Sequence, residues 1–380
     1  MDYYTSLILL AILTLVTLVF MIASNQNILK KKRKGFIIAM IMSMTGASCE
    51  WIGIQLDGQF GDLMPVLAIA LHYLIKMIEL AIVPIMTVVC ARTVFKSQNE
   101  NRWIEYWVCA YVALELTSPW TGLVFGVDDN NIYHHGDLYF IYIATFIIAT
   151  LYLFVEVLKF SEYCQNRNIA VLAEMICFTI LGVSLQLANQ ETKTCWITVA
   201  ILSVFIHDYY IDLSQYLDPL TYLLNRKSFD AKLNSYKSQS KICTIIFIDI
   251  NDFSKVNNRY GHIKGDECLK EIANILRKCY ARRKSWCYRY GGDEFAIIMD
   301  GDGYGPGDIR GTLNTEIIKS KKKIQELPFI AVGVGVYSPL ENTIKEALEI
   351  ADIDMYTNKN QTKNVQRKKI RFVRKFSSLT

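Results

Sequence analysis

The stretch Arg289-Tyr-Gly-Gly-Asp-Glu-Phe295, written RYGGDEF, decides the fold of the C-terminal half of the chain. Short β-type runs flank it at residues 288–290 and 295–299, so the residues between them predict a β-hairpin. Two glycines permit positive φ and let the backbone approach a bulky group, and two carboxylates follow at once. Taken alone, a glycine hairpin with solvated acids is the plain alternative.

A further acid precedes this hairpin. Residues 242–250 (ICTIIFIDI) have the β-branched composition of a buried strand, and Asp249 stands near its C-terminal end. If this strand end and the hairpin converge, two or three carboxylates surround a site that suits Mg²⁺, completed by phosphate oxygens and water. Metal ions that bridge an attacking oxygen and a triphosphate are a standard means of nucleotidyl transfer.

The remaining C-terminal pattern predicts a soluble α/β domain. We expect helices at 265–283, 309–327 and 343–359, a strand at 329–337 and a final edge strand at 367–374. The basic tail after residue 366 and the cluster Lys319–Lys323 indicate solvated faces or attraction to an anionic membrane leaflet. We therefore expect no nucleic acid among the partners.

The N-terminal half has the composition of a membrane domain. Before Gln215 there are 12 Lys/Arg and 17 Asp/Glu, and from Gln215 onward 29 and 19, so the net charge of +5 is the sum of −5 and +10. A membrane span needs about 20 mostly apolar residues. An all-α bundle of seven transmembrane helices is predicted over residues 1–213, followed by a second domain over 214–380. The apolar runs lie at about 5–23, 36–56, 64–94 (kept as one span despite Pro84), 103–125, 137–158, 169–188 and 194–213.

Lysine and arginine in the short loops predict the orientation of the bundle. Nine basic residues lie in the loops after the first, third and fifth runs, and only Lys193 lies in the loops after the second, fourth and sixth. This alternation places the N-terminus outside and the C-terminal domain in the cytoplasm. We expect a multi-pass membrane protein, with the lipid bilayer as a partner.

Several ionisable residues lie inside the apolar runs, and three of them share one helix face by their spacing. Such residues usually face a bundle interior or a cavity. Two interpretations stay open: a ligand or ion pocket that feeds a sensor, or pairs that neutralise one another and fix helix packing. The three are His72, Lys76 and Glu79, and the others are Glu50, Glu115, Glu156 and Glu174.

Five ordered motifs resemble the GGDEF family of diguanylate cyclases over about 155 residues. They are 218–226 (DPLTYLLNR), 247–258 (FIDINDFSKVNN), 261–266 (GHIKGD), 289–295 (RYGGDEF) and 351–359 (ADIDMYTNK). The resemblance implies a palm-like α/β domain with a mainly antiparallel sheet flanked by helices. It also implies the condensation of two GTP molecules into cyclic di-GMP with release of two pyrophosphates. Each domain would hold one GTP, which implies a homodimer through the GGDEF domains and the membrane bundle, and downstream cyclic di-GMP receptors.

The resemblance assigns metal and catalytic roles by position. Asp249, Asp293 and the Ile250 carbonyl would hold two Mg²⁺ ions per site, with Mn²⁺ as a substitute. Glu294 would activate the 3′-hydroxyl or support a metal ion. Gly292 would let the backbone lie against the phosphates.

The remaining roles concern GTP. A carboxylate that accepts from the guanine N1–H and N2–H₂ selects against adenine, which has neither donor. Lysine side chains would provide the positive charges that contact the β- and γ-phosphates of GTP. The implied guanine contacts are Asn257 and Asp266, and the implied phosphate contacts are the amides near Asp252 and Phe253 and the side chains of Lys359 and Lys363.

The chain departs from the family pattern at four places. Ser254 replaces a lysine, Asn251 replaces the second Asp of a DxD pair, and Lys363 replaces an arginine, which loses a bidentate contact. These changes predict weaker GTP binding without loss of the chemistry. The family's allosteric inhibitory site is degenerate, because its RxxD positions are Arg282 and Ser285, so little product inhibition is expected.

An active diguanylate cyclase regulated by its membrane domain is the leading hypothesis. A second is a weak or inactive GGDEF domain that binds GTP or cyclic di-GMP and signals by contact. A third is a membrane transporter or receptor that carries a vestigial domain.

Overall fold

The computed structural model describes residues 3–25, 30–59, 65–95, 102–166, 168–188, 193–280 and 284–377. It describes no side chains at 30–31, 65, 187 and 362–377. The contacts of the chain divide it into two compact units, Met1–Ser214 and Gln215–Thr380.

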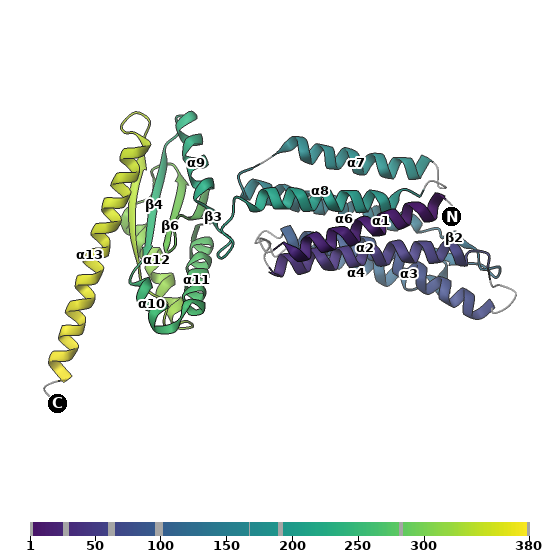
Figure 1. Ribbon diagram of the computed structural model, residues 1–380, viewed down its shortest axis with the longest axis horizontal. Helices are drawn as coiled ribbons and strands as arrows, with labels where there is room; N and C mark the ends of the chain where they lie inside the picture. The colour runs from purple at the N-terminus through teal and green to yellow at the C-terminus, as the bar shows by residue number, and fades with distance from the viewer. Residues whose placement is uncertain are drawn as a thin grey trace. The chain divides into compact units, whose positions relative to one another are not determined.

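Unit 1 is a bundle of helices that lie side by side (Figure 1). Among the described residues, six helices are long and apolar enough to cross a membrane. The third predicted run forms one helix in spite of Pro84, as the sequence predicted. It ends in a π-helical turn, Ala91–Phe95, which the sequence did not predict. The six are α1 (Tyr3–Ser24), α2 (Lys30–Leu56), α3 (Pro65–Cys90), α6 (Tyr139–Tyr163), α7 (Ile169–Ala188) and α8 (Cys195–Ser214).

The fourth predicted run, 103–125, does not form one long helix, so the count of seven spans is not confirmed. It forms α4 (Trp103–Glu115), whose 13 residues extend about 20 Å against a hydrocarbon core of about 30 Å. Pro119 opens a separate short helix, α5 (Ser118–Thr121), which the left-handed Gly122 ends. Two short antiparallel strands follow, β1 (Phe125–Val127) and β2 (Tyr133–His135).

The segment from α4 to β1 nevertheless runs along most of α3. At its start, the Glu105 carboxylate lies 3.3 Å from the Arg92 guanidinium. At its end, the Val127 N–H donates to the Tyr73 hydroxyl over 3.0 Å. Tyr73 and Arg92 are separated by about 28 Å of helix at 1.5 Å per residue. The non-helical Val124 and Phe125 are fully buried, so their backbone is shielded inside the bundle.

Unit 2 is a five-stranded mixed sheet in the order β3-β5-β6-β4-β7, flanked by helices. The β3–β5 pair is parallel and the other pairs are antiparallel, in agreement with a mainly antiparallel sheet. The buried strand, the hairpin and the strand at 329–337 were predicted correctly. The elements are β3 (Leu224–Asn225), α9 (Arg226–Ser238), β4 (Cys243–Ile250), α10 (Phe253–Tyr260), α11 (His262–Tyr280), β5 (Ser285–Arg289), β6 (Glu294–Asp300), α12 (Pro306–Lys321), β7 (Ile330–Tyr337) and α13 (Ile344–Ser377).

The predicted edge strand at 367–374 was wrong, because this segment continues α13. The helix begins with a capping box in which the Glu346 N–H donates to Thr343 Oγ1 and the Thr343 N–H donates to the Glu346 carboxylate. Neither glycine nor proline follows within the helix to stop it. Strand β7 is therefore one edge of the sheet, and β3 is the other.

Helix α13 covers β7 at very short range. A Cβ atom at Gly333 would lie 2.0 Å from the Ala351 carbonyl oxygen, and one at Gly335 would lie 2.2 Å from the Ala347 carbonyl oxygen. Side chains of α13 also accept from the free amides of the edge strand: Asp354 from the Val334 N–H and Asn358 from the Val332 N–H, each over 2.9 Å. The glycines of β7 thus fix the distance between α13 and the sheet.

Candidate active site

Three carboxylates meet where β4 ends and the β5–β6 hairpin turns. The register of β4 and β6 places Asp249 opposite Glu294, and the Ile250 N–H donates to the Asp293 carbonyl over 3.2 Å. These acids interact with one another. Partial burial is the main cause that raises the pKa of Glu294, and the negative charges of Asp293 and Asp249 raise it further. A neighbouring acid of α13, Asp352, raises it further. The predicted convergence of strand end and hairpin is therefore present in the structure.

The hairpin tip is held from one side and open on the other. The Glu294 carbonyl accepts from the Tyr290 N–H over 2.8 Å and from the Gly291 N–H over 3.1 Å. The Arg289 guanidinium donates to the Gly292 carbonyl over 2.7 Å. A Cβ atom added to Gly292 would meet no atom within 4 Å. The space beside the Gly292 Cα atom is thus free for a group that approaches the backbone.

Arg289 connects this hairpin to the start of the unit. Its guanidinium also donates to both Asp218 carboxylate oxygens over 3.1 Å, and both side chains are mostly buried. Asp218 in turn accepts from the Thr221 N–H over 2.8 Å. The sequence analysis gave neither Asp218 nor Arg289 a role. The only signal for this pair in the sequence was that the two residues, with opposite charges, belong to two of the quoted motifs. They are 71 positions apart, so the sequence did not indicate that they are in contact.

Lys359 of α13 reaches the same carboxylates. Its ammonium lies 2.6 Å from Asp249 Oδ1. The two groups form an ion pair, but their angles do not make a hydrogen bond. The Asp249 residue is 9% exposed, so a nearby positive charge offsets much of the cost of burying its carboxylate. The close packing of α13 on β7 sets this position of Lys359.

The two residues expected to read guanine lie on neighbouring helices. A Cβ atom at Gly265 would lie 1.9 Å from Asn257 Oδ1, so α10 and α11 approach each other closely here. Asp266, the next residue along α11, is exposed. Asn257 Oδ1 is buried without a hydrogen-bond partner among the described residues. The structure thus places Asn257 beside the residue that precedes Asp266.

The segment that links β4 to α10 has a strained start. Asp252 adopts a left-handed conformation with φ of 55° immediately before Phe253, the first residue of α10. The Asp252 carboxylate lies 3.0 Å from the Lys255 ammonium, so Lys255 is paired locally. Asn251 is buried, and its side-chain amide has no hydrogen-bond partner among the described residues. Ser254 is exposed.

Three expected positions receive only partial or no description. Arg282 lies outside the described residues, and the Lys363 side chain is not described although its backbone belongs to α13. Ser285, the other position of the inhibitory site, begins β5, and its hydroxyl donates to the Tyr280 carbonyl. The expected lack of product inhibition stays a prediction.

The side chains of the site supply only oxygen donors and an ammonium group. Among the described residues, no three His, Cys, Asp or Glu side chains are arranged to hold a metal ion as they stand. Carboxylates near a carbonyl such as that of Ile250 are nevertheless the donors that Mg²⁺ prefers. Asp249 is already in contact with a cation, Lys359. The donor chemistry therefore fits a divalent ion once Asp249 and Lys359 separate.

Comparison with known proteins identifies the family of this unit. Residues 215–365 match the family described as "Diguanylate cyclase, GGDEF domain". Diguanylate cyclase DgcN of Escherichia coli strain K12 is 32% identical over 158 residues, which cover 38% of this chain and 37% of that protein. Diguanylate cyclase A of Treponema denticola is 29% identical over 211 residues, which cover 50% of this chain and 55% of that protein. The chain thus spans about a third to a half of the length of these relatives.

Solved structures of GGDEF domains are also similar to this unit. The GGDEF domain of DgcB from Caulobacter crescentus, in complex with c-di-GMP, covers 39% of this chain and 89% of its own. The sequence identity is 23% and the TM-score is 0.34. From the family match and the named relatives, residues 215–365 are identified as a GGDEF domain of the diguanylate cyclase family.

Proposed function

We propose that this protein is a membrane-bound diguanylate cyclase that condenses two GTP molecules into cyclic di-GMP and two pyrophosphates. The observation that carries the proposal is the convergence of Asp249, Asp293 and Glu294 beside the open space before Gly292. The names of the relatives agree with this activity.

The same residues explain how a nucleotide and its metal ions would be held. Asp249, Asp293 and the Ile250 carbonyl would bind two Mg²⁺ ions, and the Gly292 backbone would lie against the phosphates. Bound Mg²⁺ neutralises charge that develops on the phosphate oxygens during transfer. Lys359 would leave Asp249 and, with Lys363, meet the terminal phosphates.

The chemistry needs a base and a second nucleotide. In each half-reaction, the 3′-oxygen of one GTP forms a bond to the α-phosphorus of the other, and the bond to the departing pyrophosphate breaks. Glu294 would accept the proton that the 3′-hydroxyl loses, since its raised pKa makes it a stronger base than an ordinary carboxylate. Because each domain would hold one GTP, the active form is a homodimer.

The membrane topology is part of the proposal. Six long apolar helices support membrane insertion, and the α4–β1 segment supports a seventh, partly non-helical crossing because it runs along α3 with its irregular backbone buried. Irregular backbone is tolerated at membrane depth when protein covers it. Seven crossings agree with the basic loops in placing the N-terminus outside and the GGDEF domain in the cytoplasm.

Control by the membrane domain follows from the linkage along the chain. Helix α8 ends at Ser214, and the GGDEF match begins at residue 215. With so little chain between them, a shift or rotation of α8 is the route by which the bundle would change the catalytic unit.

The test uses the full-length protein in lipid nanodiscs with GTP and Mg²⁺, with cyclic di-GMP measured by mass spectrometry. Synthesis is expected in the wild type and in the exposed-loop variant Asp302→Ala, and at least about a hundredfold less in Asp293→Ala. No cyclic di-GMP from the wild type contradicts the proposal. GTP binding without turnover would favour the alternative, a GGDEF domain that only binds nucleotide.

A further inference from the structure

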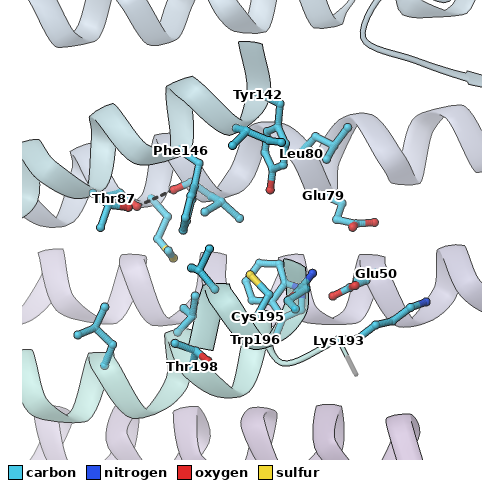
Figure 2. Close-up of a pocket in the computed structure, with 18 of the residues that line it drawn as sticks. Glu50, Glu79, Leu80, Thr87, Tyr142, Phe146, Lys193, Cys195, Trp196 and Thr198 are labelled. Carbon is cyan, nitrogen blue, oxygen red and sulfur yellow. Dashed lines mark hydrogen bonds between the residues drawn. The ribbon is translucent and has the colours of Figure 1, made fainter. Parts of the chain in front are cut away.

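The membrane unit encloses a cavity of about 710 Å³, a size typical of small-molecule sites. Residues of α2, α3, α6, α7, α8 and β2 line it. In Figure 2, Glu50, Glu79 and Lys193 lie at one end, and Thr87 and Thr198 lie farther along it. The first predicted interpretation of the intramembrane charges, a pocket, therefore has a physical counterpart.

The second interpretation, neutralising pairs, accounts for only part of these charges. Lys76 and Glu79 form an ion pair of 2.9 Å, and the Lys76 ammonium also lies 4.7 Å from the Tyr133 ring centre. Glu156 pairs with Lys159 at the edge of the bundle. The cavity residues that remain are the ones that bear on a ligand.

Glu50 is a buried acid with no salt bridge to any described residue, and its carboxylate interacts with the Tyr4 hydroxyl. It is 8% exposed, and it lines the cavity. The lining contains three carboxylates, Glu50, Asp57 and Glu79, against two ammonium groups, Lys76 and Lys193. The described lining thus has one more carboxylate than ammonium group, and Glu50 is the buried carboxylate without an ion pair of its own.

His72 offers a second acceptor. Its ring is fully buried and lines the cavity, and its Nδ1 lies 3.1 Å from Asn131 Oδ1. The Asn131 amide nitrogen donates to the Leu56 and Gln59 carbonyls, so its oxygen is the atom that faces His72. Nδ1 must then carry the proton, which leaves Nε2 as a bare acceptor. Among the described residues Nε2 has no partner.

Most of the remaining lining is apolar, with a few threonines among it such as Thr87 and Thr198. Val83 and Met86 of α3, Phe146 of α6 and Leu202 and Ile206 of α8 line it. An acyl or other hydrocarbon chain would bury its surface there, at roughly 0.8 kcal/mol per methylene group.

We propose that this cavity binds an amphiphilic amine, with its N–H donors at Glu50 and His72 and its hydrocarbon part between α3, α6 and α8. The site also includes the first part of the helix that leads to unit 2, since Trp196, Thr198 and Leu202 of α8 line the cavity and α8 ends directly before Gln215. The polar end lies near the beginning of α8, which the proposed topology places toward the outside.

The test measures saturable binding of three probes to the full-length protein in nanodiscs: decylamine, decanol and decanoic acid. Decylamine is expected to bind at least about tenfold more tightly than decanol, because only it can make charge-assisted bonds to the acceptors. Glu50→Gln should remove that preference, and Glu50→Asp should retain part of it. Glu174→Gln, the same change at an exposed position of α7, is the matched control and should leave it intact.

Three outcomes overturn the inference. They are equal affinity for the three probes, preference for decanoic acid, and equal behaviour of the Glu50→Gln and Glu174→Gln variants. Thermal unfolding without probe identifies a variant that fails to fold, in which case Glu50→Asp and His72→Phe carry the test. Nucleotide turnover is not measured, so the result is independent of the proposed function.

Discussion

The Lys359 ammonium lies 2.6 Å from Asp249 Oδ1, so a side chain expected on the phosphates of GTP is instead paired with a residue expected to bind metal. Both roles cannot be filled at once by the same arrangement. On the proposed function, Lys359 would compete with a divalent cation for Asp249 until nucleotide phosphates drew it away.

Substituting Lys359→Gln should separate these two effects. We expect the KM for GTP to rise by about tenfold, the scale of one hydrogen bond to a charged group. The Mg²⁺ concentration for half-maximal activity should fall, because Asp249 loses its competing cation. Steady-state kinetics of cyclic di-GMP formation measure both. Lys345→Gln, a fully solvated position on the same helix, should change neither. An unchanged KM for GTP in Lys359→Gln would contradict the assignment.

The Asp218–Arg289 pair is expected to act as one unit that positions the hairpin. Asp218→Asn should lower kcat by more than it changes the KM for GTP, because Arg289 then holds the Gly292 carbonyl less firmly. A double-mutant cycle with Arg289→Gln should give a coupling of about 1–3 kcal/mol, as found for groups in one network. Additive effects of the two substitutions on kcat/KM would show that the pair has no joint role.

Much of unit 2 was predictable because its strands and acids are local features of the sequence. Residues 242–250 and 289–299 contain their own β-type runs, and Asp249, Asp293 and Glu294 stand at the ends of those runs. Helix 343–359 was also predicted, but its length was not. Residues 367–374 were assigned to an edge strand, although no glycine or proline precedes them within the helix.

The relations that position the site could not be predicted from one sequence. The ion pairs Lys359–Asp249 and Asp218–Arg289 join residues far apart in the chain, and nothing local specifies such contacts. In unit 1, hydropathy gave six helices correctly but not the end of α4 at Glu115. Mean hydropathy counts apolar residues and does not register that Pro119 and Gly122 interrupt a helix.

The glycines of β7 provide a stability prediction with an internal control. Gly333→Ala should destabilise unit 2 by about 1–3 kcal/mol, the cost of overpacking, because the new methyl group would overlap the α13 backbone. Cyclase activity should fall as well, since α13 carries Lys359. Gly311→Ala, in α12 and facing open space, should stabilise by about 1 kcal/mol. Hydrogen exchange of unit 2 amides measures both, and equal effects of the two substitutions would refute the packing argument.

Acid should weaken the contact between α11 and α12. Hydrogen bonds from Lys278 first, and then from Lys319, hold the pKa of Glu316 at about 2. An unfolded glutamate has a pKa of about 4.3, so the folded state binds fewer protons between these values. The stabilisation is therefore complete above about pH 4.3 and is lost as the pH falls toward 2. We expect Glu316→Gln to reduce amide protection in α12 at neutral pH and to match the wild type at the acid end. High salt should shrink the difference, since the Lys278 and Lys319 side chains are exposed to solvent. A difference that does not depend on pH would have another cause.

Gly292 allows stability and function to be separated at a single atom. Because an added Cβ would meet no protein atom within 4 Å, Gly292→Ala should leave thermal unfolding unchanged. The methyl group would instead occupy the space proposed for the phosphates, so the KM for GTP should rise and cyclic di-GMP synthesis should fall by at least about tenfold. Gly303→Ala, in the loop after β6 and equally open, should alter neither quantity. Full activity of Gly292→Ala would mean that no substrate group approaches this backbone. If activity and stability both fell, the loss of activity would come from damage to the folded structure and not from a lost contact with GTP.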